Sequence, residues 1–199
     1  MNTGKKGIIW EVLRKLVHLG ALVIPILYWF LPWKFSITVL SLVTFGVVIA
    51  DASRLIHTPF TRFIYRKVGR LLRRHEYKKF TGASYILTAS LLVILVFPKP
   101  IAVTVLVYII VGDTAASIFG KLFGRTKLAK GKSLEGSLAF LTFAFLASVP
   151  VPYVPTTTKF LGAMFATVVE FLPLKLDDNL TVPILTGLFL KIIAGILAG

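Results

Sequence analysis

Four acidic residues lie near the ends of long apolar segments, where they could form an ion-binding site: Asp51, Asp113, Glu135 and Glu170. Asp113 lies about seven residues from the end of its apolar run, which is roughly 10 Å along a helix. Ionisable residues at such depth in a membrane are functional candidates by default. Carboxylates hold Mg²⁺ together with waters and phosphates, and neighbouring lysines and arginines offset the remaining phosphate charge. The pattern therefore favours a magnesium-polyphosphate site, and for Asp113 alone an interhelical ion pair is the alternative.

The segment 121–133 is rich in glycine and lysine, and its sequence GKS at 131–133 is like the end of a P-loop. A P-loop also needs a glycine five positions earlier and a preceding strand. That earlier position is Thr126, and an apolar helix is expected before it, so we exclude a P-loop. The glycines still let backbone N–H groups approach an anion, as does the helix expected from Leu134. We predict a phosphate-binding loop, although turns and helix ends would use the same glycines.

Two shorter patterns concern helix faces. Small residues recur every fourth position at Gly112, Ala116 and Gly120, which predicts close helix packing. In the sequence EVLRKLVH, residues 11–18, Glu11 is one turn from Lys15 and Arg14 is one turn from His18. A surface ion pair and membrane anchoring explain most of this pattern, and His18 within an apolar span is a further candidate.

Apolar helices must position these residues. The chain has 199 residues, is 56% hydrophobic, and contains no cysteine, which excludes disulfides and cysteine-based zinc sites. Its mean hydropathy is +0.85. Since about 20 residues cross a bilayer, we predict an all-α polytopic membrane bundle of about seven helices in one domain, 1–199. The expected spans are 16–32, 35–52, 81–98, 100–120, 134–150, 158–173 and 179–198.

Basic residues are distributed very unevenly between the two sides of this topology. Of the 23 lysines and arginines, all but Lys34, Lys99, Lys159 and Lys191 fall on one side, which the positive-inside rule assigns to the cytoplasm together with the N-terminus. The segment 53–80 is predicted to be a basic amphipathic cytoplasmic region that binds anionic lipids. On so hydrophobic a chain, the net charge of +15 indicates topology and lipid contact, and we expect no nucleic-acid partner.

Several motifs occur in order along the chain and together resemble a known family. They are Glu11-x-x-Arg14-Lys15-x-x-His18, Asp51-x-x-Arg54, Gly112-Asp113-x-x-Ala116, Gly131-Lys132-Ser133-x-Glu135-Gly136, and Glu170 followed by Asp177-Asp178-Asn179. This resembles the CTP-dependent lipid kinases, namely dolichol (polyprenol) kinase, phytol kinase and fungal-type diacylglycerol kinase. The resemblance covers residues from about 11 to 190. The chain also looks distantly like CDP-diacylglycerol synthases but lacks their cytidylyltransferase pattern.

The resemblance implies transfer of the γ-phosphoryl group of CTP to the hydroxyl of a membrane lipid alcohol, with Mg²⁺, on the cytoplasmic side. The alcohol would be a polyprenol or dolichol, a phytol-like prenol, or diacylglycerol. The expected catalytic residues are Asp113, Glu135, Glu170 and His18, with Asp113, Glu135 and Asp178 as metal ligands. The expected nucleotide- or phosphate-binding residues, within or around the loop 121–133, are Arg14, Lys15, Lys130, Gly131, Lys132, Ser133 and Asn179.

Three alternatives remain. A cytidylyltransferase would make a CDP-lipid from the same substrates. A transporter could relay protons through an aspartate and a histidine in its spans, but the acids gather on one side. A non-catalytic anchor using 53–80 would leave Asp113 and Glu135 without a role. The sequence does not determine the lipid alcohol, the preference for CTP over ATP or UTP, or the oligomeric state.

Overall fold

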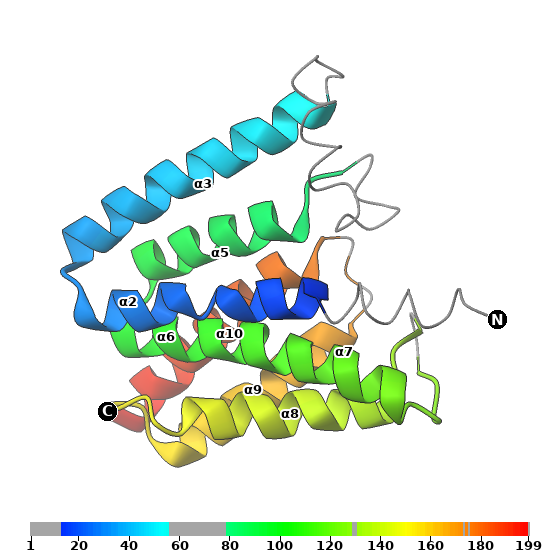
Figure 1. Ribbon diagram of the computed structural model, residues 1–199. Coiled ribbons are helices and arrows are strands. Elements are labelled where there is room, and N and C mark those ends of the chain that lie inside the picture. Colours follow the sequence, from blue (N-terminus) through cyan, green and yellow to red (C-terminus); the bar gives the residue numbers. More distant parts are fainter. Residues whose placement is uncertain (1–12, 56–78, 129–130, 173, 175, 199) are drawn as a thin grey trace.

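The computed structural model describes residues 13–55, 79–128, 131–172, 174 and 176–198, and this part of the chain is helical (Figure 1). A helical stretch over 13–20 comes first. It is followed by α2 (Val23–Phe30), α3 (Trp33–Leu55), α5 (Gly82–Val96), α6 (Lys99–Val107), the π-helix η3 (Tyr108–Gly112), α7 (Asp113–Leu122), α8 (Leu134–Ser148), α9 (Thr156–Phe171) and α10 (Asp178–Ala198). The prediction of an all-α fold is confirmed.

Four helical stretches are long and apolar enough to cross a membrane: Leu13–Phe30, Trp33–Leu55, Lys99–Leu122 and Asp178–Gly195. Gly82–Val96 and Leu134–Ser148 are shorter apolar helices. All seven predicted runs are largely helical, but among the described residues only these four stretches meet both the length and the composition expected of a span. Seven crossings therefore remain a prediction.

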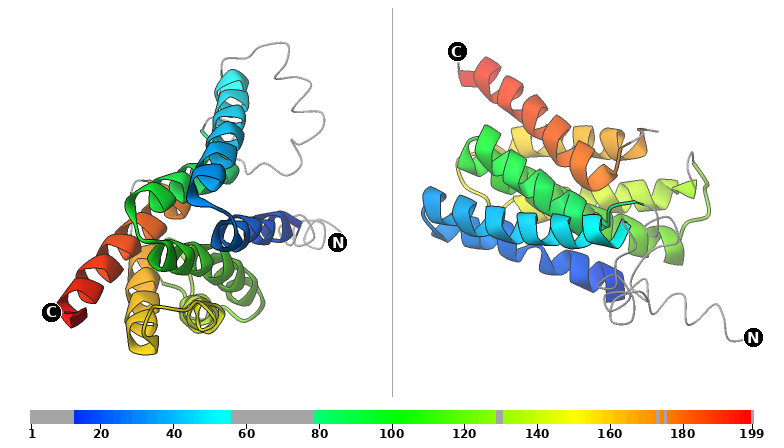
Figure 2. Two further views of the ribbon diagram at one scale, coloured as in Figure 1. Left: turned by 90° about the vertical axis from the view of Figure 1, so that its left-hand side faces the viewer. Right: turned by 90° about the horizontal axis from the view of Figure 1, so that it is seen from above.

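The ends of the helices gather at two opposite ends of the bundle. The ends of α3 and α7 and the beginnings of α5, α8 and α10 lie toward the end of the bundle at which the first helical stretch begins (Figures 1 and 2). The turns from α2 to α3 and from α5 to α6 lie at the opposite end. The acids and the glycine-lysine loop are thereby brought to one end. The predicted surface segment 53–80 lies mostly outside the described residues.

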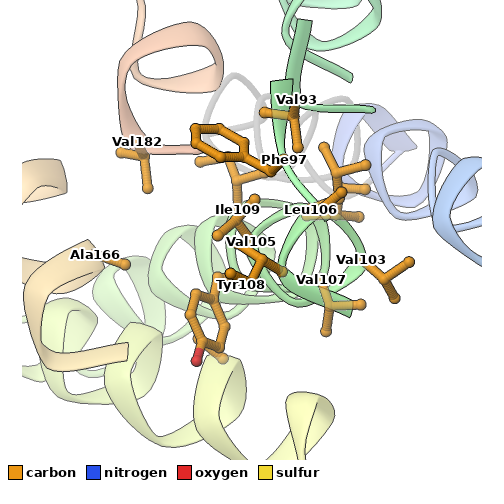
Figure 3. Close-up of a cluster of buried hydrophobic side chains, with 14 of the residues drawn as sticks. Val93, Phe97, Val103, Val105, Leu106, Val107, Tyr108, Ile109, Ala166 and Val182 are labelled. Carbon is orange, nitrogen blue, oxygen red and sulfur yellow. The ribbon is translucent and has the colours of Figure 1, made fainter. Parts of the chain in front are cut away.

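The core surrounds the continuous helix formed by α6, η3 and α7. Val105, Leu106, Tyr108 and Ile109 are fully buried there (Figure 3). A helix that is apolar on every side is expected to be buried. Tyr108 satisfies its one polar group by donating its hydroxyl hydrogen to the carbonyl oxygen of Lys159 at 2.6 Å.

The predicted stripe of small residues packs α7 closely against α8, as expected. A Cβ atom on Gly112 would lie 2.9 Å from the ring of Phe140. On Gly136 of α8, a Cβ atom would lie 3.0 Å from the carbonyl oxygen of Ala116 and 3.3 Å from the Cα atom of Gly120. The two backbones approach so closely that neither contact leaves space for a larger residue.

Two of the lysines outside the basic side satisfy helix ends. The Nζ atom of Lys99 donates to the carbonyl oxygens of Trp29 (3.1 Å) and Leu31 (3.3 Å) at the end of α2. The Nζ atom of Lys159 donates to the carbonyl oxygen of Val149, just after α8, at 2.9 Å. The last carbonyls of a helix lack intrahelical partners, and a cation there is favourable. These exceptions to the charge asymmetry therefore have a structural role.

Candidate functional site

Asp113 is held by two residues of the first helical stretch. The Nζ atom of Lys15 lies 2.5 Å from Asp113 Oδ2 and also donates to the backbone oxygen of Asp113 at 3.2 Å. The Nε2 atom of His18 lies 3.6 Å from the same carboxylate oxygen. Lys15 and His18 are three positions apart and share one helix face, so both side chains reach Asp113. Glu11, the helix neighbour of Lys15 predicted from the sequence, lies outside the described residues.

A second charged cluster joins the loop to α9 and α10. The Nζ atom of Lys132 lies 2.7 Å from Glu170 Oε1 and 2.9 Å from Asp178 Oδ2, and it also donates to the backbone oxygen of Glu170. Burial lowers the pKa of Lys132, but the charges and hydrogen bonds of the two acids outweigh this and raise its pKa above the ordinary value. Lys132 is therefore an ammonium ion held between two carboxylates.

A cavity of about 430 Å³ lies between these two clusters, and we call it the polar cavity. Four lysines and two acids contribute to its wall, together with small residues of α7 and α8. The charged residues are Lys15, Asp113, Lys121, Lys127, Lys132 and Glu170. With more cations than anions and with glycine backbone in its wall, the cavity suits a phosphate-bearing ligand.

Local backbone geometry directs the loop into this cavity. Gly131 has φ +74°, a conformation that favours glycine, and the N–H group of Leu128 donates to the carbonyl oxygen of Lys132 at 2.8 Å. An isolated antiparallel bridge joins Lys127 to Ser133. The hydroxyl of Ser133 then caps α8 by accepting from the N–H group of Gly136 at 3.2 Å. This tight return of the chain carries Lys132 into the cavity wall.

Two other residues expected at the loop have different placements. Glu135 Oε1 accepts a hydrogen bond from the N–H group of Thr126 at 3.1 Å, so this carboxylate fixes the loop. Glu135 is not among the described residues that line the polar cavity. Lys130 lies outside the described residues.

A second and larger cavity, of about 600 Å³, lies between the first helical stretch, α2, α3 and α5, and we call it the apolar cavity. Its walls are mostly aliphatic and aromatic side chains, such as Leu27, Phe35 and Ile86. Its polar lining residues include Arg14, Lys15, His18, Asp113 and Asn179. Lys15 and Asp113 are therefore in the walls of both cavities.

Asn179, for which a role in nucleotide or phosphate binding is expected, lies in the wall of the apolar cavity. It is in the first turn of α10, where its N–H group donates to Asp177 Oδ1 at 3.0 Å. Its own Oδ1 atom is buried and has no hydrogen-bond partner among the described residues. It is not among the described residues that line the polar cavity.

Asp51 is also buried, but in a network of its own. Its carboxylate accepts hydrogen bonds from the Nε atom of Arg54 (3.1 Å), the N–H and hydroxyl groups of Thr81 (2.7 Å each) and the hydroxyl of Ser84 (2.5 Å). Arg54 also donates to the carbonyl oxygen of Lys79 at 2.7 Å. This network joins the end of α3 to the start of α5, where Thr81 lines the apolar cavity. Asp51 therefore stabilises the part of the cavity wall that Thr81 forms.

The π-helical turn η3 ends directly before Asp113. The apolar run 100–120 predicts one uninterrupted helix here, so this turn is a difference from the prediction. Such turns widen a helix locally and are frequent at functional sites. The extra residue in the turn changes the rotation of α7 relative to α6, and with it the direction of Asp113. Nothing in the residue pattern around 108–112 indicated this turn.

Comparison with known proteins shows the family of the chain. An uncharacterised protein of Rickettsia prowazekii is 28% identical over 185 residues, which cover 88% of this chain and 90% of that protein. The CTP-dependent diacylglycerol kinase 1 of Schizosaccharomyces pombe is 30% identical over 164 residues, covering 72% of this chain and 74% of the kinase. The chain belongs to the CTP-dependent lipid kinase family.

Another relative of this lipid kinase is the chloroplastic phytol kinase 1 of Arabidopsis thaliana. The two are 30% identical over 213 residues, covering 92% of this chain and 66% of the relative. No family model and no solved structure matches the chain. A lipid kinase must bring a water-soluble phosphoryl donor and a membrane-embedded acceptor to one point. In this family member, the polar and apolar cavities both reach the Lys15–Asp113 pair.

Proposed function

We propose that the protein transfers the γ-phosphoryl group of CTP to the hydroxyl of a membrane lipid alcohol. The observation that carries this proposal is that Asp113 and Lys15 line both the polar and the apolar cavity. A donor in one cavity and an acceptor in the other would meet at Asp113. Phosphoryl transfer depends mainly on such positioning and on charge stabilisation.

The polar cavity is the proposed donor site. Lys121, Lys127 and Lys132 would offset the charge of the phosphates, and the loop glycines would let backbone N–H groups approach them. Arg14 and His18 line the apolar cavity, with His18 Nε2 3.6 Å from Asp113 Oδ2, and they would contact the transferred phosphoryl group. CTP is proposed as the donor from the names of the diacylglycerol kinases in the family.

The residues present fit Mg²⁺. Glu170 Oε2 is buried without a hydrogen-bond partner among the described residues, and Asp113 lines the same cavity. The described residues contain no group of three or more acids or histidines that could hold a metal. That agrees with Mg²⁺, which usually keeps waters and binds through one or two carboxylates plus substrate phosphates. Asp113 and Glu170 would hold the ion, which would neutralise charge on the phosphates.

The apolar cavity is the proposed acceptor site. Its aliphatic walls suit the hydrocarbon chain of a polyprenol or dolichol, a phytol-like prenol, or diacylglycerol, with the hydroxyl at the Asp113 end. The names of the relatives include both diacylglycerol kinase and phytol kinase. We further propose seven membrane crossings and a cytoplasmic N-terminus, which would place Asp113 near the cytoplasmic surface.

The proposed reaction forms one bond, breaks one bond and releases one proton to a residue that lines the apolar cavity. The alcohol oxygen forms a bond to the γ-phosphorus as the bond from that phosphorus to the β,γ-bridging oxygen breaks. CDP leaves, and the product is a lipid monophosphate. Asp113 is the one acid among the described residues lining the apolar cavity, so it is the proposed acceptor of the hydroxyl proton.

The test is a transfer assay with purified protein, Mg²⁺, a panel of lipid alcohols, and CTP radiolabelled at the γ-phosphate. We expect a labelled lipid monophosphate, and ATP and UTP in parallel reactions measure donor preference. CTP labelled at the α-phosphate distinguishes the alternative reaction. Incorporation of the α label with release of pyrophosphate would instead identify a cytidylyltransferase and refute the kinase proposal.

A further inference from the structure

Two buried side-chain oxygens without hydrogen-bond partners among the described residues lie in the walls of the two cavities. Asn179, whose Oδ1 atom is one of them, lines the apolar cavity, and Ser137, whose Oγ atom is the other, lines the polar cavity. Leaving a buried polar atom unpaired is unfavourable, so native proteins rarely do so without a reason. In a cavity wall, a bound ligand can supply the missing partner.

Two contacts anchor the backbone at the start of α10, where Asn179 lies. Its backbone N–H group is bonded to the side chain of Asp177, and the next carboxylate, Asp178, is paired with Lys132 at 2.9 Å. The backbone that carries the Asn179 side chain is therefore anchored before any ligand arrives. The apolar cavity that it lines is mostly hydrocarbon, so a polar group there selects strongly for the polar end of a ligand.

We infer that Asn179 binds the hydroxyl of the lipid alcohol and holds it beside Asp113. This inference rests on the proposed function. In the bound state the hydroxyl donates its hydrogen to Asn179 Oδ1. The hydroxyl then turns its hydrogen from Asn179 Oδ1 to the Asp113 carboxylate, which takes the proton as the oxygen–phosphorus bond forms, and Asn179 remains neutral throughout. A neutral acceptor beside Asp113 avoids the repulsion that a second carboxylate would add.

The inferred role of Asn179 at the lipid hydroxyl differs from the role in nucleotide or phosphate binding that is expected from the sequence. A residue that reads cytosine or ribose would have to face the donor, but Asn179 lines only the apolar cavity of the two. Ser137 provides the matched comparison, because it has the same kind of unpaired buried oxygen and lines only the polar cavity. Replacing Asn179 should therefore weaken binding of the lipid alcohol, and replacing Ser137 should weaken binding of the nucleotide.

The kinetic experiment compares Asn179→Ala with Ser137→Ala in the transfer assay. We expect Asn179→Ala to raise KM for the alcohol roughly three- to tenfold, the effect of one lost hydrogen bond, and to leave KM for the nucleotide unchanged. Ser137→Ala should do the reverse. An altered preference for CTP over UTP in Asn179→Ala, with the alcohol KM unchanged, would overturn the inference. If Asn179→Ala does not fold, Asn179→Ser keeps a small acceptor and should show a smaller rise.

A binding experiment tests the hydroxyl contact without requiring catalysis. The full-length protein in nanodiscs is titrated with geranylgeraniol and with its methyl ether, which cannot donate a hydrogen bond. We expect the wild-type protein to bind the alcohol roughly three- to tenfold more tightly than the ether, and Asn179→Ala to bind both equally. Equal binding of alcohol and ether by the wild type would overturn the inference. Alcohol-selective binding without any labelled product would instead count against the proposed kinase reaction alone.

Discussion

Lys15 and Asp113 are 98 positions apart in the sequence, yet Lys15 Nζ lies 2.5 Å from Asp113 Oδ2. Lys15 is almost completely buried, whereas the Asp113 side chain keeps 27% of its surface exposed. The pair joins the first helical stretch to α7 at the position where the two cavities meet. One contact therefore connects the stability of the bundle to the proposed chemistry.

Replacing Asp113 with asparagine should remove the proposed proton acceptor, which is also a proposed Mg²⁺ ligand, while keeping the shape of the side chain. We expect transfer to fall by about 10²- to 10⁴-fold, the usual contribution of a general base. The measurement is the rate of γ-label incorporation at saturating alcohol and nucleotide. Full activity in a variant that elutes as a folded protein would exclude Asp113 as the base.

The same substitution should destabilise the bundle, because it leaves the buried Lys15 ammonium without its carboxylate. Since Asp113 is partly exposed, we expect a loss of about 1 to 3 kcal/mol in the free energy of unfolding. The double variant Lys15→Met/Asp113→Asn should recover part of this loss while remaining inactive. Thermal unfolding in detergent of the four proteins in this cycle measures the coupling, and strictly additive effects would contradict it.

Substituting Gly136 with alanine should separate α7 from α8. The added Cβ atom would lie 3.0 Å from the carbonyl oxygen of Ala116, and backbone can move away only if the helix shifts. We expect a destabilisation of about 1 to 3 kcal/mol and weaker nucleotide binding, because Ser133 and the loop move with α8.

The matched control for this substitution is Gly46→Ala in α3. A Cβ atom there meets nothing within 4 Å, and alanine is the better helix former. This variant should be neutral or stabilised by up to about 1 kcal/mol. Comparable melting-temperature losses in both variants would mean that the close approach of α7 and α8 is not the cause.

Removing the Asp51 carboxylate should disturb the wall of the apolar cavity. In Asp51→Ala the buried Arg54 loses its contact with the Asp51 carboxylate, and Thr81 and Ser84 lose their shared acceptor. We expect a loss of about 3 to 5 kcal/mol in unfolding free energy. Ser84→Ala removes one donor and should lose only about 1 kcal/mol. Equal losses in the two variants, measured by thermal unfolding, would contradict this hierarchy.

Chelation of divalent cations should stop the reaction, and Mg²⁺ should restore it. Glu170→Gln should raise the Mg²⁺ concentration needed for half-maximal activity at least about tenfold, because it replaces a proposed ligand. Glu135→Gln should leave that concentration unchanged, because Glu135 bonds to the loop. If Glu135→Gln raised this Mg²⁺ concentration and Glu170→Gln did not, the metal ligand would be Glu135, as expected from the sequence, and not Glu170.

The sequence predicted the apolar helices, the acids near their ends, and close packing along one face of the helix that contains Asp113. These features follow from local properties: apolar run length, helix period, and small residues such as Gly112 and Gly120 at every fourth position. The motifs that resemble those of lipid kinases are also short runs of residues close together in the sequence, so they could be recognised without the structure.

Only the tertiary structure decided which side chains meet. Lys15 pairs with Asp113, Glu170 lines the polar cavity whereas Glu135 fixes the loop, and Asn179 faces the apolar cavity. These outcomes depend on which helices are neighbours and how each is rotated about its axis. The π-turn before Asp113 changes that rotation without any sign in the local residue pattern. A helical period predicts which residues share a face, but it does not predict what that face will contact.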